Sequence, residues 1–176
     1  LEGCELDARG GHRKSTALAF RDLPDELVRW LVERGLDVDA PDQYNERPLV
    51  ARCHRNQDPT ILIELGAQIG RPGEEKQPLF ALVYRPKMVR LLIDAGADPL
   101  ALDRAGRGLI ENALTYASNM DLPRLAETVK ILLAEGAPIP EDAAARVTRL
   151  GEILEFARPN FDVDSIAEVS AAMDEL

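Results

Sequence analysis

Apolar residues recur along this chain in short runs, and each run ends at a glycine. The runs "LVRWLVERG", "PTILIELG", "KMVRLLIDAG" and "ETVKILLAEG" have apolar residues at positions i, i+3 and i+4. This spacing predicts helices with one buried stripe, and glycine is the residue best suited to the left-handed conformation that closes a helix. Pro24, Pro59 and Pro123 stand near acidic residues upstream of three runs, which predicts helix starts there.

The same pattern returns at a nearly constant period. The glycines that close the runs are Gly3, Gly35, Gly66, Gly96 and Gly136, so successive spacings are 32, 31, 30 and 40 residues. After each glycine come a polar, extended stretch and a second short apolar segment, "STAL", "RPLV", "QPLF" or "RGLI". The repeating unit is therefore predicted to be helix, hairpin-like connector, helix. One such unit cannot bury its own apolar faces, but stacked neighbours can.

These units resemble ankyrin repeats, in the "PL" at a helix start, the "VRLLIDAGADP" at the end of the next helix, and the period. The resemblance implies an all-α, ankyrin-type helical repeat solenoid with about four repeats over 1–140. The repeats are 7–39, 40–71, 72–101 and 102–140, after a partial unit 1–6. The family's Thr-Pro-Leu-His-x-Ala signature is degraded: Ser15-Thr16-Ala17-Leu18 and Arg47-Pro48-Leu49 keep parts of it, and no repeat keeps the His.

The first residues align with the end of a second helix. "LEGCELDA" matches "VERGLDVDA" when both are placed on their glycine, so Leu1 and Glu2 are expected to close a helix whose beginning is missing. Either the chain is cut from a longer protein, or an eroded N-terminal cap lies just outside it.

The fourth repeat is longer than the others. Leu18 to Gly35, Leu49 to Gly66 and Leu79 to Gly96 each span 17 residues, whereas the fourth repeat needs 26 or 27, counted to Gly136 from Ile110 or Leu109. The extra residues fall in 115–127. They are expected either to form part of a binding edge or to lengthen a helix pair that shields the last repeat.

The segment 141–176 abandons the repeat pattern and is predicted to form two C-terminal capping helices. Asp142 can cap the first, which carries Val147, Leu150, Leu154 and Ala157 at helical spacing and ends before Pro159. Ile166, Val169 and Met173 mark the second. Nine acidic and three basic residues in this segment favour either a solubilising array end or an acidic docking patch.

Ankyrin modules usually bind a protein through a concave face, which is formed by the hairpin tips and the exposed side of each first helix. The resemblance therefore implies candidate contact residues at these positions. Tyr and Arg dominate interface hot spots. Tyr84 and Tyr116 could instead pack between helices, and Trp30 is expected in the core. The candidates are Gln43, Tyr44, Glu46, His54, Arg55, Glu74, Lys76, Tyr84, Arg85, Arg104, Arg107 and Tyr116.

Composition narrows the chemistry. A net charge of −10 disfavours nucleic acid as a partner, and no apolar stretch reaches the roughly 20 residues that span a membrane. The chain has neither a phosphate loop nor a nucleophile elbow, and it has no metal-binding motif. Cys53 and His54 are adjacent, but adjacent helical residues point about 100° apart and cannot act as a dyad. We expect no enzyme site, no cofactor and no metal.

The predicted function is protein recognition by a chain that is monomeric when free. The chain is expected to be the partner- or substrate-binding arm of a larger bacterial protein. That protein would be cytoplasmic or, if it is a secreted effector, active in a host cell. The alternative is a small acidic inhibitor, of the immunity type, that occludes a toxin or nuclease. An enzyme in its own right is disfavoured, because no constellation of catalytic residues is present.

Overall fold

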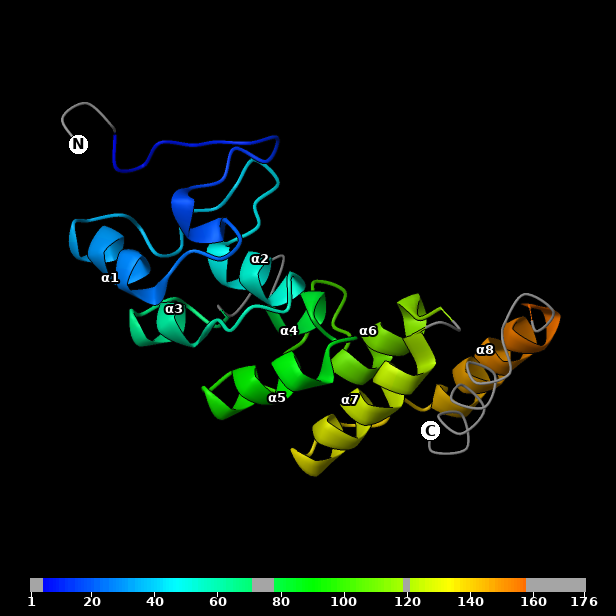
Figure 1. Ribbon diagram of the computed structural model, residues 1–176. Helices are drawn as coiled ribbons and strands as arrows, with labels where there is room; N and C mark the ends of the chain where they lie inside the picture. The colour runs from blue at the N-terminus through cyan, green and yellow to red at the C-terminus, as the bar shows by residue number, and fades with distance from the viewer. Residues whose placement is uncertain (1–4, 71–77, 119–120, 158–176) are drawn as a thin grey trace. The chain divides into compact units, whose positions relative to one another are not determined.

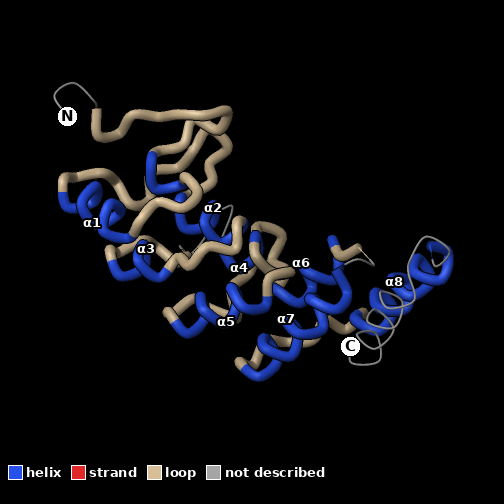
Figure 2. Tube along the Cα trace, in the orientation of Figure 1, coloured by secondary structure: helices blue, strands red, loops and turns tan. Residues whose placement is uncertain are grey.

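The computed structural model describes residues 5–70, 78–118 and 121–157, with side chains up to residue 152. Helices are the only regular elements in these ranges, apart from one isolated antiparallel bridge between Gly10 and Ser15 (Figures 1 and 2). The all-α prediction is thus confirmed. The elements are η1 (Ala17–Ala19), α1 (Asp25–Glu33), α2 (Pro48–His54), α3 (Thr60–Glu64), α4 (Pro78–Ala81), α5 (Pro86–Asp94), α6 (Leu109–Tyr116), α7 (Leu122–Ala134) and α8 (Ala143–Ala157).

Glycine closes the second helix of each of the four repeats, as predicted. Gly35, Gly66, Gly96 and Gly136 have φ angles of 97°, 89°, 101° and 83°. In each case the next amide donates to the carbonyl of the leucine four residues before the glycine, at 2.8–3.1 Å. This is the hydrogen bond expected when a left-handed residue ends a helix. The four leucines, Leu31, Leu62, Leu92 and Leu132, are buried.

The predicted helix starts are also confirmed. α1 begins directly after Pro24, and α3 directly after Pro59. Asp58 accepts hydrogen bonds from the amide and the hydroxyl of Thr60, at 2.8 and 2.5 Å, and so satisfies an amide that the helix leaves without a partner. α7 begins at Leu122, with Pro123 in its first turn.

One compact unit lies within residues 1–71 and contains η1 to α3. In this unit α1 packs beside α3, and η1 packs beside α2 (Figure 1). The expected first helix of the repeat 7–39 is reduced to the single 3-10 turn η1, which corrects the prediction of a full helix pair. Asp22 adopts a left-handed φ of 59°, and Pro24 already caps α1, so only Ala17–Ala19 remain for the helix.

A second compact unit lies within residues 72–176 and contains α4 to α8. Here α5 packs beside α7, α4 beside α6, and α6 also contacts α7 and α8 (Figure 1). α8 corresponds to the first of the two helices predicted in 141–176, and its Leu150 is fully buried. The second predicted capping helix lies outside the described residues.

The extra length of the fourth repeat lies largely in its helices. α7 has 13 residues against nine in α5, and α6 has eight against four in α4. Within the predicted insertion, Leu122, Leu125 and Ala126 are buried. This burial favours the shielding role for residues 115–127 over a binding edge.

Trp30 does not lie in the core, which corrects the prediction. Its side chain is 36% exposed, and the guanidinium of Arg34 lies over the indole ring, 3.8 Å from the centroid. The buried residues of α1 are Val28 and Leu31. Trp30 follows Val28 by two residues, about 200° around the helix, so it cannot point into the same core.

Candidate partner-binding tips

Two hairpin-like turns have the same pattern of hydrogen bonds. We call residues 42–46 the Asp42 tip and residues 103–107 the Asp103 tip. In the first, the carboxylate of Asp42 accepts hydrogen bonds from the amides of Tyr44 and Glu46, at 2.8 and 3.0 Å. In the second, Asp103 accepts from the amides of Ala105 and Arg107, at 2.8 and 2.9 Å. An aspartate that bonds the backbone two residues on is a typical turn-former.

The backbone of the two tips also matches. The amide of Asp42 donates to the carbonyl of Glu46, and the amide of Asp103 donates to the carbonyl of Arg107, both at 2.9 Å. The fourth residue of each tip has a positive φ, 61° at Asn45 and 77° at Gly106. Asparagine and glycine are the residues that tolerate this conformation best. Both tips are therefore well-defined supports for the side chains that they carry.

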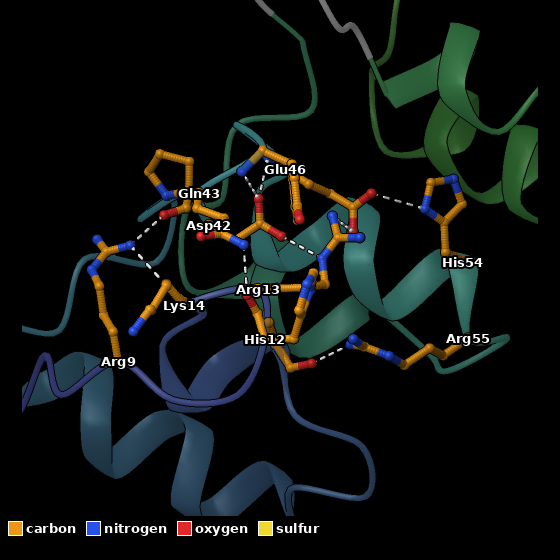
Figure 3. Close-up of polar contacts among 12 residues, drawn as sticks. Arg9, His12, Arg13, Lys14, Asp42, Gln43, Glu46, His54 and Arg55 are labelled. Carbon is orange, nitrogen blue, oxygen red and sulfur yellow. Dashed lines mark hydrogen bonds and ion pairs between the residues drawn. The ribbon is translucent and has the colours of Figure 1, made fainter.

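The Asp42 carboxylate is buried and bound by the neighbouring repeat. Arg13 donates from Nε to Asp42 at 2.5 Å and from Nη2 to Glu46 at 3.1 Å, as Figure 3 shows. Burial opposes ionisation of Asp42, but the hydrogen bonds from Glu46, Arg13 and Tyr44 outweigh it, so the pKa of Asp42 lies below its usual range. This contact joins the first two repeats through their tips.

The Asp103 carboxylate is held within its own repeat. Arg107 donates from Nε and Asn112 donates from Nδ2 to the same oxygen, at 2.8 and 3.0 Å. Burial opposes ionisation here too, but these bonds and the backbone amides lower the pKa of Asp103 to about 2. The carboxylate therefore stays charged at any physiological pH, and the tip keeps its frame.

Tyr44 stands on the Asp42 tip within a small aromatic and cationic cluster. Its side chain is 47% exposed, and the ring of His12 is stacked beside it with a centroid distance of 6.1 Å. The guanidinium of Arg13 lies over the Tyr44 ring at 5.1 Å. Sequence reasoning missed His12 and Arg13. Aligning "GHRKS" (11–15) with "DQYNE" (42–46) as equivalent tips would have found them, and the structure supports that alignment because Lys14 and Asn45 share the left-handed φ.

Tyr116 has a similar cationic neighbour in the second unit. It is 63% exposed at the end of α6, and its hydroxyl accepts a hydrogen bond from Arg107 at 3.1 Å. The same guanidinium lies 5.2 Å from the ring centroid. The bonds to Tyr116 and Asp103 raise the pKa of Arg107. The structure thus brings together Arg107 and Tyr116, two of the predicted contact residues.

Four other predicted contact residues make bonds within their unit. Gln43 donates to the carbonyl of His12 at 2.5 Å, and His54 lies 3.1 Å from the Glu46 carboxylate. Arg55 donates to the carbonyl of Ala19, so it holds the end of η1 (Figure 3). Gln43 and Arg55 thus join their repeat to the preceding one, whereas His54 is held within its own repeat. A partner would compete with these bonds.

Tyr84 and the remaining candidates lie in different settings. Tyr84 is half-buried, its hydroxyl donates to the carbonyl of Ala113 at 2.8 Å, and burial raises its pKa to about 12. The packing alternative is thus favoured for this tyrosine. Arg85 is the residue directly before α5, and Arg104 is an exposed residue of the Asp103 tip. Glu74 and Lys76 lie outside the described residues.

The side chains suited to catalysis or metal binding are dispersed. Within the part of the chain that the structure describes, no group of three or more His, Cys, Asp or Glu residues could hold a metal ion. Cys53 is a fully buried thiol on α2, whereas the neighbouring His54 turns to Glu46. Among the described helices, none combines the length and the apolar character that crossing a membrane requires.

Comparison with known proteins agrees with this architecture. Two-helix units that are closed by glycine and joined through hairpin-like tips define a helical repeat protein. No known family profile and no curated protein matches the sequence. Among solved structures, the chain is similar to an ankyrin repeat domain from Acinetobacter baumannii AYE, with a TM-score of 0.59 and 23% identity, over 96% of this chain and 84% of that chain. The chain has the ankyrin-repeat fold.

Proposed function

We propose that this chain is a non-catalytic module that recognises a protein partner through its tips. One observation carries the proposal: two exposed tyrosines, Tyr44 and Tyr116, each lie beside an arginine that is itself fixed by a tip aspartate. A tyrosine ring buries a large area at a small cost in conformational entropy. The tip aspartate already holds the neighbouring arginine in place before a partner arrives. Binding therefore loses less conformational entropy from the arginine side chain.

The setting that we favour is the partner- or substrate-binding arm of a larger bacterial protein. In this setting any chemistry belongs to a domain outside residues 1–176. The bacterial source of the similar solved domain supports a bacterial origin. If that larger protein is a secreted effector, the partner is a host protein; otherwise the partner is cytoplasmic.

The net charge of −10 favours a second setting, in which the chain is a small acidic inhibitor. A surface with this excess of carboxylates would be attracted to a basic toxin or nuclease and would speed their encounter. The binding would then depend steeply on salt, because exposed charges are screened. Recognition by aromatic anchors would depend on salt only modestly.

The experiment is affinity capture with the purified chain from bacterial and from eukaryotic lysates, read by mass spectrometry. A Tyr44→Ala/Tyr116→Ala double variant is run in parallel, with Tyr84→Phe as the matched control. The proposal expects a specific protein that the chain and the control capture and that the double variant loses. Circular dichroism must show the same helical signal for all three proteins. A protein captured equally by the double variant would contradict tip recognition.

The captured protein also separates the two settings. A specific eukaryotic protein would support the effector arm. A bacterial toxin or nuclease, lost at raised salt, would support the inhibitor.

A further inference from the structure

Charge is unevenly divided within the first compact unit. The hairpin-like turns, η1 and α2 lie in the segments 9–19 and 42–56, which together contain six basic and two acidic residues. The remaining residues of 5–70, which include α1 and α3, contain three basic and ten acidic residues. The net charge of −10 therefore does not describe the segments that carry Tyr44.

Both carboxylates of the two basic segments already have a cationic partner. Arg13 binds Asp42 and Glu46, at 2.5 and 3.1 Å. Two of the other arginines are taken out of solvent, since Arg47 and Arg52 are only 7% and 4% exposed. The positive charge that a partner could reach is therefore carried by other residues.

Arg9 and Lys14 are the exposed cations of the turn that precedes η1, and we call residues 9–15 the basic turn. The guanidinium of Arg9 donates to the carbonyls of Lys14 and Pro41, at 3.3 and 2.5 Å (Figure 3). These bonds place Arg9 beside Lys14, but a carbonyl does not neutralise its charge. Among the described residues, no carboxylate forms an ion pair with Arg9 or with Lys14.

The backbone of the basic turn is closed by its own hydrogen bonds. The amide of Gly10 donates to the carbonyl of Ser15, and the amide of Ser15 donates back to Gly10, at 3.0 and 3.2 Å. The amide of Lys14 donates to the carbonyl of Gly11 at 3.2 Å. Cations on a turn that is already ordered lose less conformational entropy when a partner binds.

The basic turn is also bonded to the Asp42 tip. Gln43 donates from its backbone amide to the carbonyl of Arg13 and from its side chain to the carbonyl of His12, at 2.9 and 2.5 Å. The exposed ring of His12 is stacked beside the ring of Tyr44. Exposed cations and an exposed aromatic ring thus lie on two connected turns. We call the following residues the basic patch: Arg9, His12, Lys14 and Tyr44.

We propose that the basic patch binds an acidic segment of the partner protein. Asp or Glu side chains of that segment pair with Arg9 and Lys14, and the segment packs on the ring of Tyr44. The inference rests on the proposed function, because it names the chemistry of the partner at one of the proposed binding residues. Ionised carboxylates bind arginine and lysine through strong, charge-assisted hydrogen bonds. Complementary charge of this kind guides the encounter and rejects partners of the wrong sign.

The surroundings of the basic patch favour a short protein segment over a nucleic acid. A nucleic acid carries a continuous row of phosphates, which would extend beyond the patch. The ten acidic residues elsewhere in 5–70 would repel those phosphates wherever they came within about 8 Å, the screening length at physiological salt. A protein segment can place its few carboxylates on the patch alone.

The test selects ligands from a phage-displayed library of short random peptides, with the purified chain as bait. Enriched peptides are synthesised with a fluorescent label and titrated by anisotropy. Lys14→Glu reverses one charge of the basic patch, and Lys14→Arg keeps it. Lys87→Glu is the matched control, because it makes the same change of net charge at an exposed lysine of α5. Circular dichroism must show the same helical signal for every variant.

We expect the enriched peptides to contain more Asp and Glu than the unselected library. Lys14→Glu should weaken their binding about fivefold or more, because an attraction becomes a repulsion. Lys14→Arg and Lys87→Glu should bind them within about twofold of the parent chain. Tyr44→Ala should weaken the same peptides roughly tenfold, as the proposed function requires.

The other outcomes separate this inference from the proposed function. Peptides that depend on Tyr44 but carry no acidic excess would overturn the inference and leave Tyr44 as a binding residue. Peptides that bind Tyr44→Ala and Lys14→Glu as tightly as the parent would contradict recognition at the Asp42 tip as well. A selection that enriches no peptide would overturn the inference, since an acidic segment would then not suffice. Labelled oligodeoxythymidine that binds more tightly than the peptides, and is lost with Lys14→Glu, would assign the basic patch to nucleic acid.

Discussion

The Asp42 tip and the Asp103 tip have the same backbone frame but different supports. Asp42 is bound by Arg13 of the preceding repeat, whereas Asp103 is bound by Arg107 and Asn112 of its own repeat. The frame is thus set locally, by an aspartate, a residue with positive φ and two amides. The arginine that pairs with the aspartate differs: it comes from the preceding repeat for Asp42 and from the same repeat for Asp103. The Asp42 tip therefore also links two repeats. A substitution of Asp42 should destabilise the chain more than a substitution of Asp103.

The largest effect is expected when Asp42 is removed. Asp42→Ala should lower the free energy of unfolding by about 3 kcal/mol, because it leaves two tip amides and the Nε of Arg13 without an acceptor. Asp103→Ala should cost about 2 kcal/mol, since the Asp103 side chain is 15% exposed against 2% for Asp42, and water can replace more of its bonds. Urea denaturation measures both, with the exposed Asp7→Ala as a control expected within about 0.5 kcal/mol of the parent. An equal or larger loss for Asp103→Ala would refute the difference between the tips.

Acid should weaken both tips. Their aspartates have pKa values below the ordinary 3.8, so each contributes stability that is fully present above about pH 4. That stability is lost as the pH falls through the folded-state pKa, which for Asp103 is about 2. Thermal midpoints measured from pH 5 to pH 2 should fall less steeply for Asp103→Asn than for the parent chain. Parallel curves would show that the tip carboxylate does not differ in pKa between the folded and unfolded states.

The tyrosines should separate into structural and exposed residues. Tyr84→Phe removes the bond to Ala113 and should cost about 1 kcal/mol, because the carbonyl loses its donor in a partly buried site. Tyr116→Phe should cost less than about 0.5 kcal/mol, since water can replace the hydroxyl beside Arg107. Chemical denaturation compares the two. Equal losses would mean that Tyr116 is as much a packing residue as Tyr84.

The smallest effect is expected for an ion pair outside both tips. Arg29 and Glu64 are 49% and 56% exposed, so Glu64→Ala should change the free energy of unfolding by about 0.5 kcal/mol or less. The same denaturation series provides this baseline. A loss near that of Asp42→Ala would show that the tips have no special role in joining repeats.

Much of the fold could be predicted because its signals are local. The closing glycines and the prolines at helix starts depend only on backbone conformation within a few residues. Burial of Leu31, Leu62, Leu92 and Leu132 follows from their constant distance to the closing glycine. The reduction of the first helix to η1 was missed, because the left-handed Asp22 carries no strong signal in the sequence.

The site was harder to predict, because its contacts join residues about 30 positions apart. Periodicity cannot show that Arg13 binds Asp42 or that Tyr84 reaches Ala113, since each bond crosses from one repeat to the next. Trp30 was assigned to the core because it stands within the apolar run "LVRWLVERG", and the run alone does not show which of its residues face the core. Arg107 and Tyr116 were found because one lies on a tip and the other on a first helix, as the resemblance implied.

We propose that the exposed tyrosines, Tyr44 on the Asp42 tip and Tyr116 at the end of α6, bind the partner, and that Tyr84 does not. The most direct test is the dissociation constant for a captured partner, measured by calorimetry with Tyr44→Ala, Tyr116→Ala and Tyr84→Phe. At least one of the two alanine variants should bind roughly tenfold or more weakly, as expected for a hot-spot residue, while Tyr84→Phe binds like the parent chain. If both alanine variants keep the parent's affinity and helical signal, the tips do not form the binding surface.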